Sequence, residues 1–312
     1  MSAVRRFAVV VVVLTLCGAA WAGNVQVTVS EALAPVSAAN VTIEPDGMTG
    51  TTNAAGKWNA TGVTAGDAMV IAWTDAGGTL RGAIAEVTVP AHGSVSVDLS
   101  LVRAIWIQNY YPMAVGNKWE YEYRHSEVGG RPYRTTWREE VLRTVMMGPD
   151  RAVVLEAQKA GVPEWEEIRA SSADGFKMYT QQHGADEIKF DPPIRLGALM
   201  PLGYEWVASA TAHHSDGSPD TPVTFRAKLV RFEDSRVPAG MFRDCAYLEV
   251  TSEFGPEVND MALWMAKNVG VVREIEKNPE RTNEKLLTEY KIVGVPIRPL
   301  MPLRPMIRPK GH

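Results

Sequence analysis

Short runs in which apolar and polar residues alternate one by one most constrain the fold of this 312-residue chain. Near the start, Val25, Val27 and Val29 alternate with polar residues, and residues 95–99 repeat the pattern. A period of two places one set of side chains in a core and the other set in water, as in a half-buried β-strand. Turn sequences rich in Gly, Pro and Asn separate these runs. The sequence therefore predicts an all-β protein.

Residues 1–22 have the three-part layout of a secretory signal peptide. Arg5 and Arg6 precede an apolar run over residues 7–17, and residues 20–22 form a small-residue exit that reads Ala-Trp-Ala. The apolar run is too short to cross a bilayer comfortably. We expect cleavage at the end of this leader and export to the periplasm, the cell surface or the medium.

The expected cleavage leaves one cysteine in the chain. Cys17 would leave with the leader, so Cys245 has no partner for an internal disulfide and the fold must depend on packed apolar cores. A lipid anchor on Cys17 is not expected, because Leu16 occupies a position that is normally small in lipidated leaders. The leader also carries two arginines, so the remaining chain is two charges more negative than the whole chain's −4. We expect no nucleic-acid partner.

A Thr-Asn-x-x-Gly-x-aromatic stretch lies in the first part of the chain. It runs over residues 52–58, where Asn53 and Gly56 suit a tight turn and Trp58 would cover one end of a core. With the strand-like runs on both sides, this stretch resembles the carboxypeptidase regulatory-like domains. The resemblance implies a transthyretin-like β-sandwich over residues 23–101, with an accessory role and no catalytic residues.

A second β-rich domain is expected over residues 102–294. Trp119, Tyr121 and Tyr123 alternate with charged residues, and similar alternation further along the chain predicts a long antiparallel meander. Residues 259–267 are too continuously apolar to decide between a short helix and a buried strand.

Several blocks of this second domain carry a further resemblance. They are Tyr110-Tyr111-Pro112 with residues 116–121, residues 237–245, and residues 263–273. These blocks resemble a set of uncharacterised exported bacterial β-rich proteins, which are themselves similar to the lipoprotein-carrier-like half-barrels. The resemblance implies a curved antiparallel sheet, open as a half-barrel, around an apolar interior. It assigns no catalytic residues.

The aromatic residues of the second domain are the candidate ligand-binding set. Inward-facing rings on a curved sheet would line a hollow, which is the usual place for a small apolar ligand. Alternatively, the same rings fill an ordinary core. The candidates are Trp106, Tyr111, Trp119, Tyr121, Trp206 and Trp264. An apolar small molecule or a lipid is the expected ligand.

Histidines and the remaining cysteine give no catalytic or metal-binding pattern. His213 and His214 stand near Asp216 and Asp220, but this stretch is typical of an exposed hairpin loop, and no third or fourth ligand follows at a recognisable spacing. Cys245 lies among apolar residues, which predicts a buried and unreactive thiol. We expect no metal and no cofactor.

Two acidic pairs, Glu139-Glu140 and Glu166-Glu167, lie beside tryptophans. A glycosidase needs two carboxylates that face each other across a sugar. Adjacent strand residues point to opposite faces, so neither pair alone can form such a site. We expect the four carboxylates on solvated strand faces and no catalytic residue among them.

Residues 295–312 form a tail that is basic and rich in proline. Prolines recur at every third position from Pro296 to Pro305, so a polyproline II helix would place them along one edge. Such a segment would bind a protein partner, lie on an anionic envelope surface, fold back onto the acidic body of the chain, or stay disordered.

These observations predict an exported, non-enzymatic protein that binds an apolar ligand or a protein partner through its second domain. In this interpretation the first domain is a spacer or docking module. Two alternatives remain open at this point. One is a structural or assembly role at the cell surface, and the other is a hydrolase of an envelope polymer whose carboxylates meet only in the folded protein.

Overall fold

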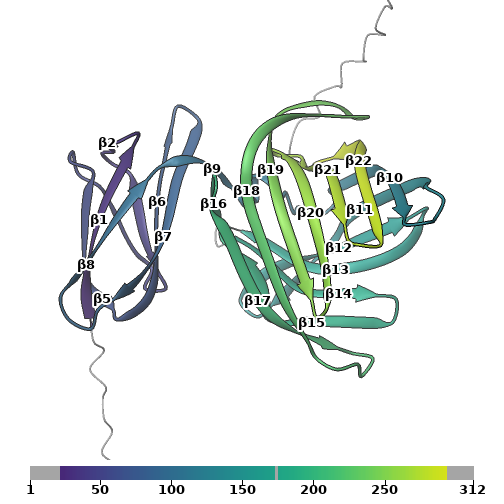
Figure 1. Cartoon of the computed structure of the whole chain (residues 1–312), viewed down its shortest axis with the longest axis horizontal. Coiled ribbons are helices and arrows are strands. Elements are labelled where there is room, and N and C mark those ends of the chain that lie inside the picture. Colours follow the sequence, from purple (N-terminus) through teal and green to yellow (C-terminus); the bar gives the residue numbers. More distant parts are fainter. Residues whose placement is uncertain (1–21, 173–174, 294–312) are drawn as a thin grey trace, which may run out of the picture. The chain divides into compact units, whose positions relative to one another are not determined.

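The computed structural model describes residues 22–172 and 175–293 of the chain (Figure 1). Strands dominate these residues, and the four-residue α1(Ile107–Tyr110) is the one α-helix among them. The predicted all-β class is confirmed. Within the described ranges, no helix is long and apolar enough to cross a membrane. The leader predicted over residues 1–22, apart from its last residue, and the tail predicted over residues 295–312 lie outside the described part.

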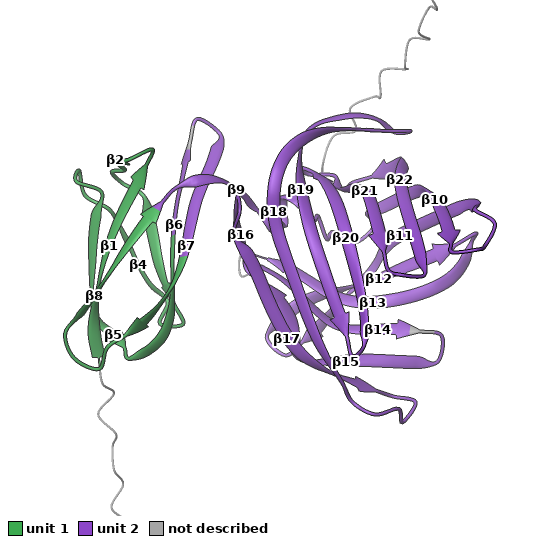
Figure 2. Ribbon diagram, in the orientation of Figure 1, with its two compact units in different colours: residues 1–71, 85–99 green, residues 72–84, 100–312 purple. Residues whose placement is uncertain are grey.

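The described chain forms two compact units (Figure 2). Residues 22–71 and 85–99 make up the first unit, and residues 72–84 and 100–293 make up the second. The division near residue 100 lies beside the predicted domain boundary. Residues 72–84, at the end of the β6(Gly66–Ala76) and β7(Thr79–Val89) hairpin, group with the second unit, although the sequence analysis placed them in the first domain.

The first unit is built on alternating strands. β1(Ala22–Glu31) pairs with β2(Ala34–Pro35), β5(Lys57–Thr64) and β8(Ser94–Ser100), while β3(Asn40–Glu44) pairs with β4(Met48–Thr51) in another sheet. Val25, Val27 and Val29 are at most 1% exposed, as the alternation predicts. These buried valines form the core side of β1.

The turn before β5 follows the predicted chemistry. The Asn53 Oδ1 atom accepts hydrogen bonds from the backbone amides of Ala55 at 2.9 Å and Lys57 at 3.0 Å. Gly56 has φ +70°, and a Cβ atom there would lie 2.4 Å from the Val29 carbonyl oxygen. Only glycine fits this position without strain, because both the backbone conformation and the close approach exclude a side chain.

Twelve antiparallel strands of the second unit close into a barrel. In chain order these strands are β10(Lys118–Glu127), β11(Tyr133–Met147), β12(Asp150–Lys159), β13(Val162–Ser172), β14(Gly175–His183), β15(Asp186–Leu196), β17(Glu205–His214), β18(Thr221–Val237), β19(Gly240–Phe254), β20(Glu257–Ala266), β21(Gly270–Lys277) and β22(Arg281–Lys291). Their meander around the barrel is visible in Figure 1.

The half-barrel expectation is wrong, because the sheet closes. β10 pairs with β22 along its whole length, from Lys118 opposite Lys291 to Glu127 opposite Arg281. This pairing removes the free edges that an open sheet would leave at its first and last strands. Residues 259–267 fall mainly in β20, which decides between helix and strand in favour of the strand.

A small sheet segment lies outside the barrel in the same unit. β16(Leu199–Pro201) pairs with β9(Val102–Trp106), and β9 pairs with Arg81 and Gly82 of β7. A Cβ atom on Gly82 would lie 2.6 Å from the Leu199 side chain. The missing side chain therefore lets the leucine pack directly against the backbone of β7.

Candidate ligand cavity in the barrel

A cavity of about 260 Å³ lies inside the barrel of the second unit. Its walls are mostly Phe, Met, Leu, Ile and Val side chains from β14, β15, β18, β19 and β20. An engineered apolar cavity of ~150 Å³ holds benzene, so a cavity of this size has room for roughly ten non-hydrogen atoms. Its volume is slightly below the range of about 300–1,000 Å³ for small-molecule sites.

Strand alternation builds the apolar wall. Met261, Leu263 and Met265 on β20 all line the cavity. Leu248 on β19 lies directly opposite Leu263 in the register and lines the cavity as well. Cross-strand partners share a face of the sheet, so each inward residue brings another inward residue beside it.

One wall of the cavity is polar. Arg169 and Glu167, both on β13, form an ion pair there, and the Arg169 Nη1 atom donates a hydrogen bond to the Tyr111 hydroxyl. The Glu167 side chain is only 4% exposed. Burial raises the pKa of Tyr111. The Arg169 Nε atom is buried and has no hydrogen-bond partner among the described residues. This wall therefore holds a guanidinium whose Nε–H donor is unused.

A second cluster of charged side chains lies next to this wall and is centred on Lys285. The Lys285 Nζ atom lies 3.1 Å from the Glu274 carboxylate and 3.3 Å from that of Glu139. Burial raises the pKa of Glu274. Burial alone would lower the pKa of Lys285, but the two carboxylates raise it overall. Lys285 therefore stays protonated at neutral pH and offsets the buried carboxylates.

Tyr111 is the one member of the predicted aromatic set that lines the large cavity. Together with Trp119 and Tyr121 it also borders a much smaller space of about 10 Å³. The Trp119 Nε1 atom donates to the Val269 carbonyl at 2.5 Å, and the Tyr121 hydroxyl donates to the Val271 carbonyl at 3.1 Å. Trp119 and Tyr121 therefore act as satisfied core residues beside the cavity.

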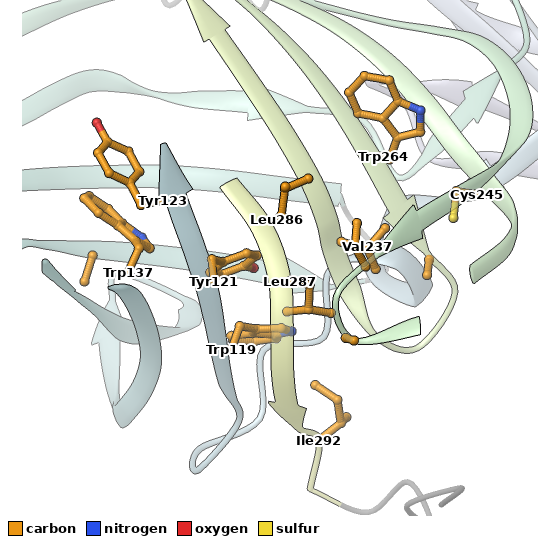
Figure 3. Packing of buried hydrophobic residues seen from close by; sticks show 14 of the residues in the cluster. Trp119, Tyr121, Tyr123, Trp137, Val237, Cys245, Trp264, Leu286, Leu287 and Ile292 are labelled. Carbon is orange, nitrogen blue, oxygen red and sulfur yellow. The ribbon is translucent and has the colours of Figure 1, made fainter. Parts of the chain in front are cut away.

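Trp264 lies on the outer face of the barrel. Its neighbours Leu263 and Met265 line the cavity, so alternation turns Trp264 away from it. Outside, the Trp264 Nε1 atom donates to Glu233 at 2.6 Å, and its ring packs edge-on against Tyr247 at 4.8 Å. Figure 3 shows Trp264 well separated from Trp119 and Tyr121.

Two further tryptophans of the predicted set also lie away from the cavity. Trp106 ends β9 and packs edge-on against Trp73, with 5.7 Å between ring centroids. Trp206 lies against Gly197, where a Cβ atom would come 2.0 Å from the indole ring, and its Nε1 atom donates to the Leu199 carbonyl at 3.0 Å. The structure therefore brings neither of these rings to the cavity wall.

The cavity is lined mainly by residues that the sequence analysis did not single out. A usable signal was present, because Val223 and Phe225 alternate with polar residues on β18 and both face the cavity. The predicted ligand-binding set consists of Trp and Tyr residues only. The rings that do line the cavity are mainly phenylalanines, which the predicted set did not include.

The expectation for the acidic pairs is wrong for one member of each. Glu139 lies opposite Trp119 in the register and Glu167 lies opposite Gln181, so both carboxylates point into the barrel. Glu140 points outward and pairs with Lys118 at 2.9 Å. Adjacent residues do face opposite sides, as expected, but the inward members are held by buried cations rather than by water.

The histidine pair divides between two sets of partners. The His213 Nδ1 atom lies 2.9 Å from Asp220, while the His214 Nδ1 atom lies 3.3 Å from Asp186. Asp186, His214 and Asp216 have possible ligand atoms within 4.8 Å of one another, and Asp186 comes from β15. Strand pairing supplies this third group, which the sequence spacing did not reveal.

Cys245 is buried on β19, as predicted. Burial raises the pKa of its thiol to about 12, with smaller contributions from nearby carboxylates. The thiolate form is therefore scarce at neutral pH, and the residue serves as a small core side chain.

Comparison with known proteins gives distant structural likenesses. No protein-family model and no curated protein matches this chain. A Bacteroides fragilis protein, provisionally classed as exported and described as having a YmcC-like fold, superposes with a TM-score of 0.41 and 15% identity. A Parabacteroides distasonis protein, provisionally classed as a lipoprotein, superposes with a TM-score of 0.36 and 13% identity. Each match covers 58% of this chain and 98% of the other. At these levels the two structures assign neither a family nor a function to this chain.

Proposed function

We propose that this chain is an exported, non-enzymatic protein that binds a small apolar or amphiphilic molecule inside the barrel of its second unit. The observation that carries the proposal is the cavity of about 260 Å³ with its mostly apolar wall. Burying each methylene group contributes ~0.8 kcal/mol, so a chain of roughly ten carbons gains enough for micromolar binding before the costs of association.

The polar groups nearest the cavity favour binding over bond cleavage. Glu167 is engaged with Arg169, and Glu274 is engaged with Lys285. A general acid or base must be free to exchange a proton with the substrate, and these carboxylates are held in ion pairs. The wall thus offers orientation for a ligand rather than a reactive group.

The proposal assigns accessory roles to the parts of the chain outside the barrel. The first unit has the buried alternating strands and the Asn53–Gly56 turn on which the transthyretin-like resemblance rests. In this proposal it is a sandwich that acts as a spacer or docking module. Residues 1–22 direct export, and the proline-rich residues 295–312 contact a protein partner.

Calorimetric titration with n-butylbenzene, a ten-carbon apolar probe, tests the proposed binding site. We expect saturable binding to the wild type. Val250 lines the cavity, so Val250→Phe should abolish binding by filling the space. The matched control is Val207→Phe, because Val207 is 47% exposed and not part of the cavity wall. Absence of binding to the wild type, or equal binding by Val250→Phe, would refute the proposal.

Protein purified from its natural host gives a second test. Native mass spectrometry should show an added mass, and solvent extraction should release an apolar compound of that mass. A clean apo mass together with an extract free of lipid and other apolar compounds would count against the proposed function.

A further inference from the structure

We infer that the cavity selects an amphiphile with a neutral, oxygen-bearing head group, such as an alcohol, an ester or an amide, over the carboxylate and the ammonium of the same chain length. The inference rests on the proposed binding function and specifies its ligand class. Its basis is the set of hydrogen-bond donors and charges on the polar wall.

Unused donors on the wall favour a ligand that carries an acceptor atom. Arg169 uses its two terminal nitrogens on Tyr111 and Glu167, which leaves its buried Nε–H without a partner among the described residues. The Tyr111 hydroxyl oxygen accepts from Arg169, so its own proton remains available to a ligand. A buried donor without an acceptor is destabilising, and an oxygen atom placed here would satisfy it.

Gln181 adds a neutral group to the same wall. It lies directly opposite Glu167 in the register of β13 and β14, and its side chain lines the cavity. A side-chain amide both donates and accepts hydrogen bonds. It therefore complements an alcohol, an ester or an amide equally well.

The charge on the wall disfavours an anionic head group. Glu167, Glu274 and Arg169 are the charged residues that line the cavity, so carboxylates outnumber cations there. Lys285 lies behind Glu274, but it is shared with Glu139. A ligand carboxylate would add a further negative charge in a buried setting, where like charges repel strongly.

The surplus of carboxylates attracts a cationic head group, but such a group does not match the donors of this wall. An ammonium group only donates hydrogen bonds, so it leaves both the Arg169 Nε–H and the Tyr111 O–H unsatisfied. It would also approach the Arg169 guanidinium, which borders the cavity. A neutral acceptor satisfies the donors and adds no charge.

Titrations with three eight-carbon ligands test this selection. Octan-1-ol, octanoate and octylammonium have nearly equal size, so differences in affinity report the head group. At pH 7.5 we expect octan-1-ol to bind about tenfold more tightly than either ion. Each unsatisfied donor or repelled charge lowers the affinity by about a factor of ten. Octanoate should gain affinity as the pH falls toward the pKa of its own carboxyl group.

Two mild variants separate the donor and charge arguments. Tyr111→Phe removes the hydroxyl proton and should weaken the binding of octan-1-ol severalfold relative to the binding of n-butylbenzene. Glu274→Gln removes one wall carboxylate, and Lys285 keeps Glu139 as a partner. This variant should narrow the preference for octan-1-ol over octanoate about tenfold. Thermal unfolding of each variant verifies that it folds.

The possible results separate the two proposals. If n-butylbenzene binds but the three head groups bind equally, or octanoate binds best, the inference about head groups is overturned and the proposed cavity function stands. If n-butylbenzene and all three amphiphiles fail to bind, both are overturned. If octan-1-ol is preferred in the wild type and Tyr111→Phe or Glu274→Gln shifts the preference as stated, the inference is supported.

Discussion

The two halves of the barrel interior differ in how they use their space. In the half bordered by β10, β11 and β22, flat rings on neighbouring strands stack, as Tyr123 and Trp137 do with centroids 5.4 Å apart. In the half bordered by β18, β19 and β20, thinner side chains such as Met261 and Leu263 surround a cavity of about 260 Å³. In the first half the rings stack against one another and fill the interior, whereas in the second half Phe rings and aliphatic side chains cover a wall without meeting across the centre.

Buried charges lie where the two halves meet. Glu274 lines the cavity, while its partner Lys285 lies over the Trp137 ring at 4.5 Å on the filled side. A buried ion pair adds little net stability, but it places polar groups at a defined depth. The border between filled and hollow space is thus also the place where a ligand head group would be oriented.

Truncation of a large side chain in each half should give the largest difference. Trp119→Ala in the filled half should lower the free energy of unfolding by about 3–5 kcal/mol, because it empties a packed site and leaves the Val269 carbonyl without its donor. Met261→Ala should cost less than about 2 kcal/mol, because its side chain already borders empty space. Urea unfolding measures both. Equal losses would contradict the distinction between the halves.

Removal of the cation at the border should be nearly as severe. Lys285→Met leaves the carboxylates of Glu274 and Glu139 buried without their ammonium, which should cost about 3 kcal/mol at pH 7.5. Lys291→Met on the same strand is the matched control, since Lys291 is exposed and should change stability by less than ~0.5 kcal/mol.

Lys285→Met should also change how the free energy of unfolding depends on pH. Burial raises the pKa of Glu274 above its ordinary value of 4.5, and loss of the ammonium should raise it further. The folded variant then binds protons more tightly than the unfolded chain, so its free energy of unfolding falls as pH rises from the ordinary value through the raised one. Urea unfolding at pH 5 should therefore recover part of the loss seen at pH 7.5. A loss that is unchanged at pH 5 would show that the carboxylates do not cause it.

Enlargement of a valine should show the same dependence on location as truncation, with a smaller loss of stability. Val141 is fully buried in the same hydrophobic cluster as Trp119 and Trp137. Val141→Phe should therefore overpack this cluster and lower the free energy of unfolding by about 1–3 kcal/mol. Val250→Phe extends into the cavity and should cost less than about 1 kcal/mol. Thermal or urea unfolding distinguishes the two variants. A larger penalty for Val250→Phe would mean that the cavity half is already full.

The last prediction, which bears least directly on the comparison, is that the Cys245 thiol reacts slowly in the native protein. β19 supplies Leu248 and Val250 to the cavity wall, and the thiol lies on the same strand with a pKa raised by burial to about 12. Alkylation by iodoacetamide at pH 8 should be about a thousandfold slower in the native protein than in urea. Rapid labelling of the native protein would indicate a mobile strand rather than a rigid wall around a cavity.

Sequence reasoning predicted the strands better than it predicted the site. Alternation around Tyr121 and around Phe225 correctly indicates strands with one buried face, since the period of a strand is a local property. Alternation does not show which aromatic residues on different strands contact each other. Trp264 and Tyr121 both belong to the predicted aromatic set, yet alternation with Leu263 and Met265 turns Trp264 away from the cavity, whereas Tyr121 borders the interior. That difference depends on the register between strands.

Local sequence patterns are enough to predict that this chain is built from strands and that Cys245 is a core residue, because alternation and apolar surroundings act over a few neighbouring positions. Tertiary structure decided that the sheet closes through the pairing of β10 with β22. It also decided that Glu167 and Glu139 turn inward to meet Arg169 and Lys285, and that a cavity remains beside them. Closure, buried ion pairs and empty volume all depend on contacts between residues far apart in the chain, which no local pattern records.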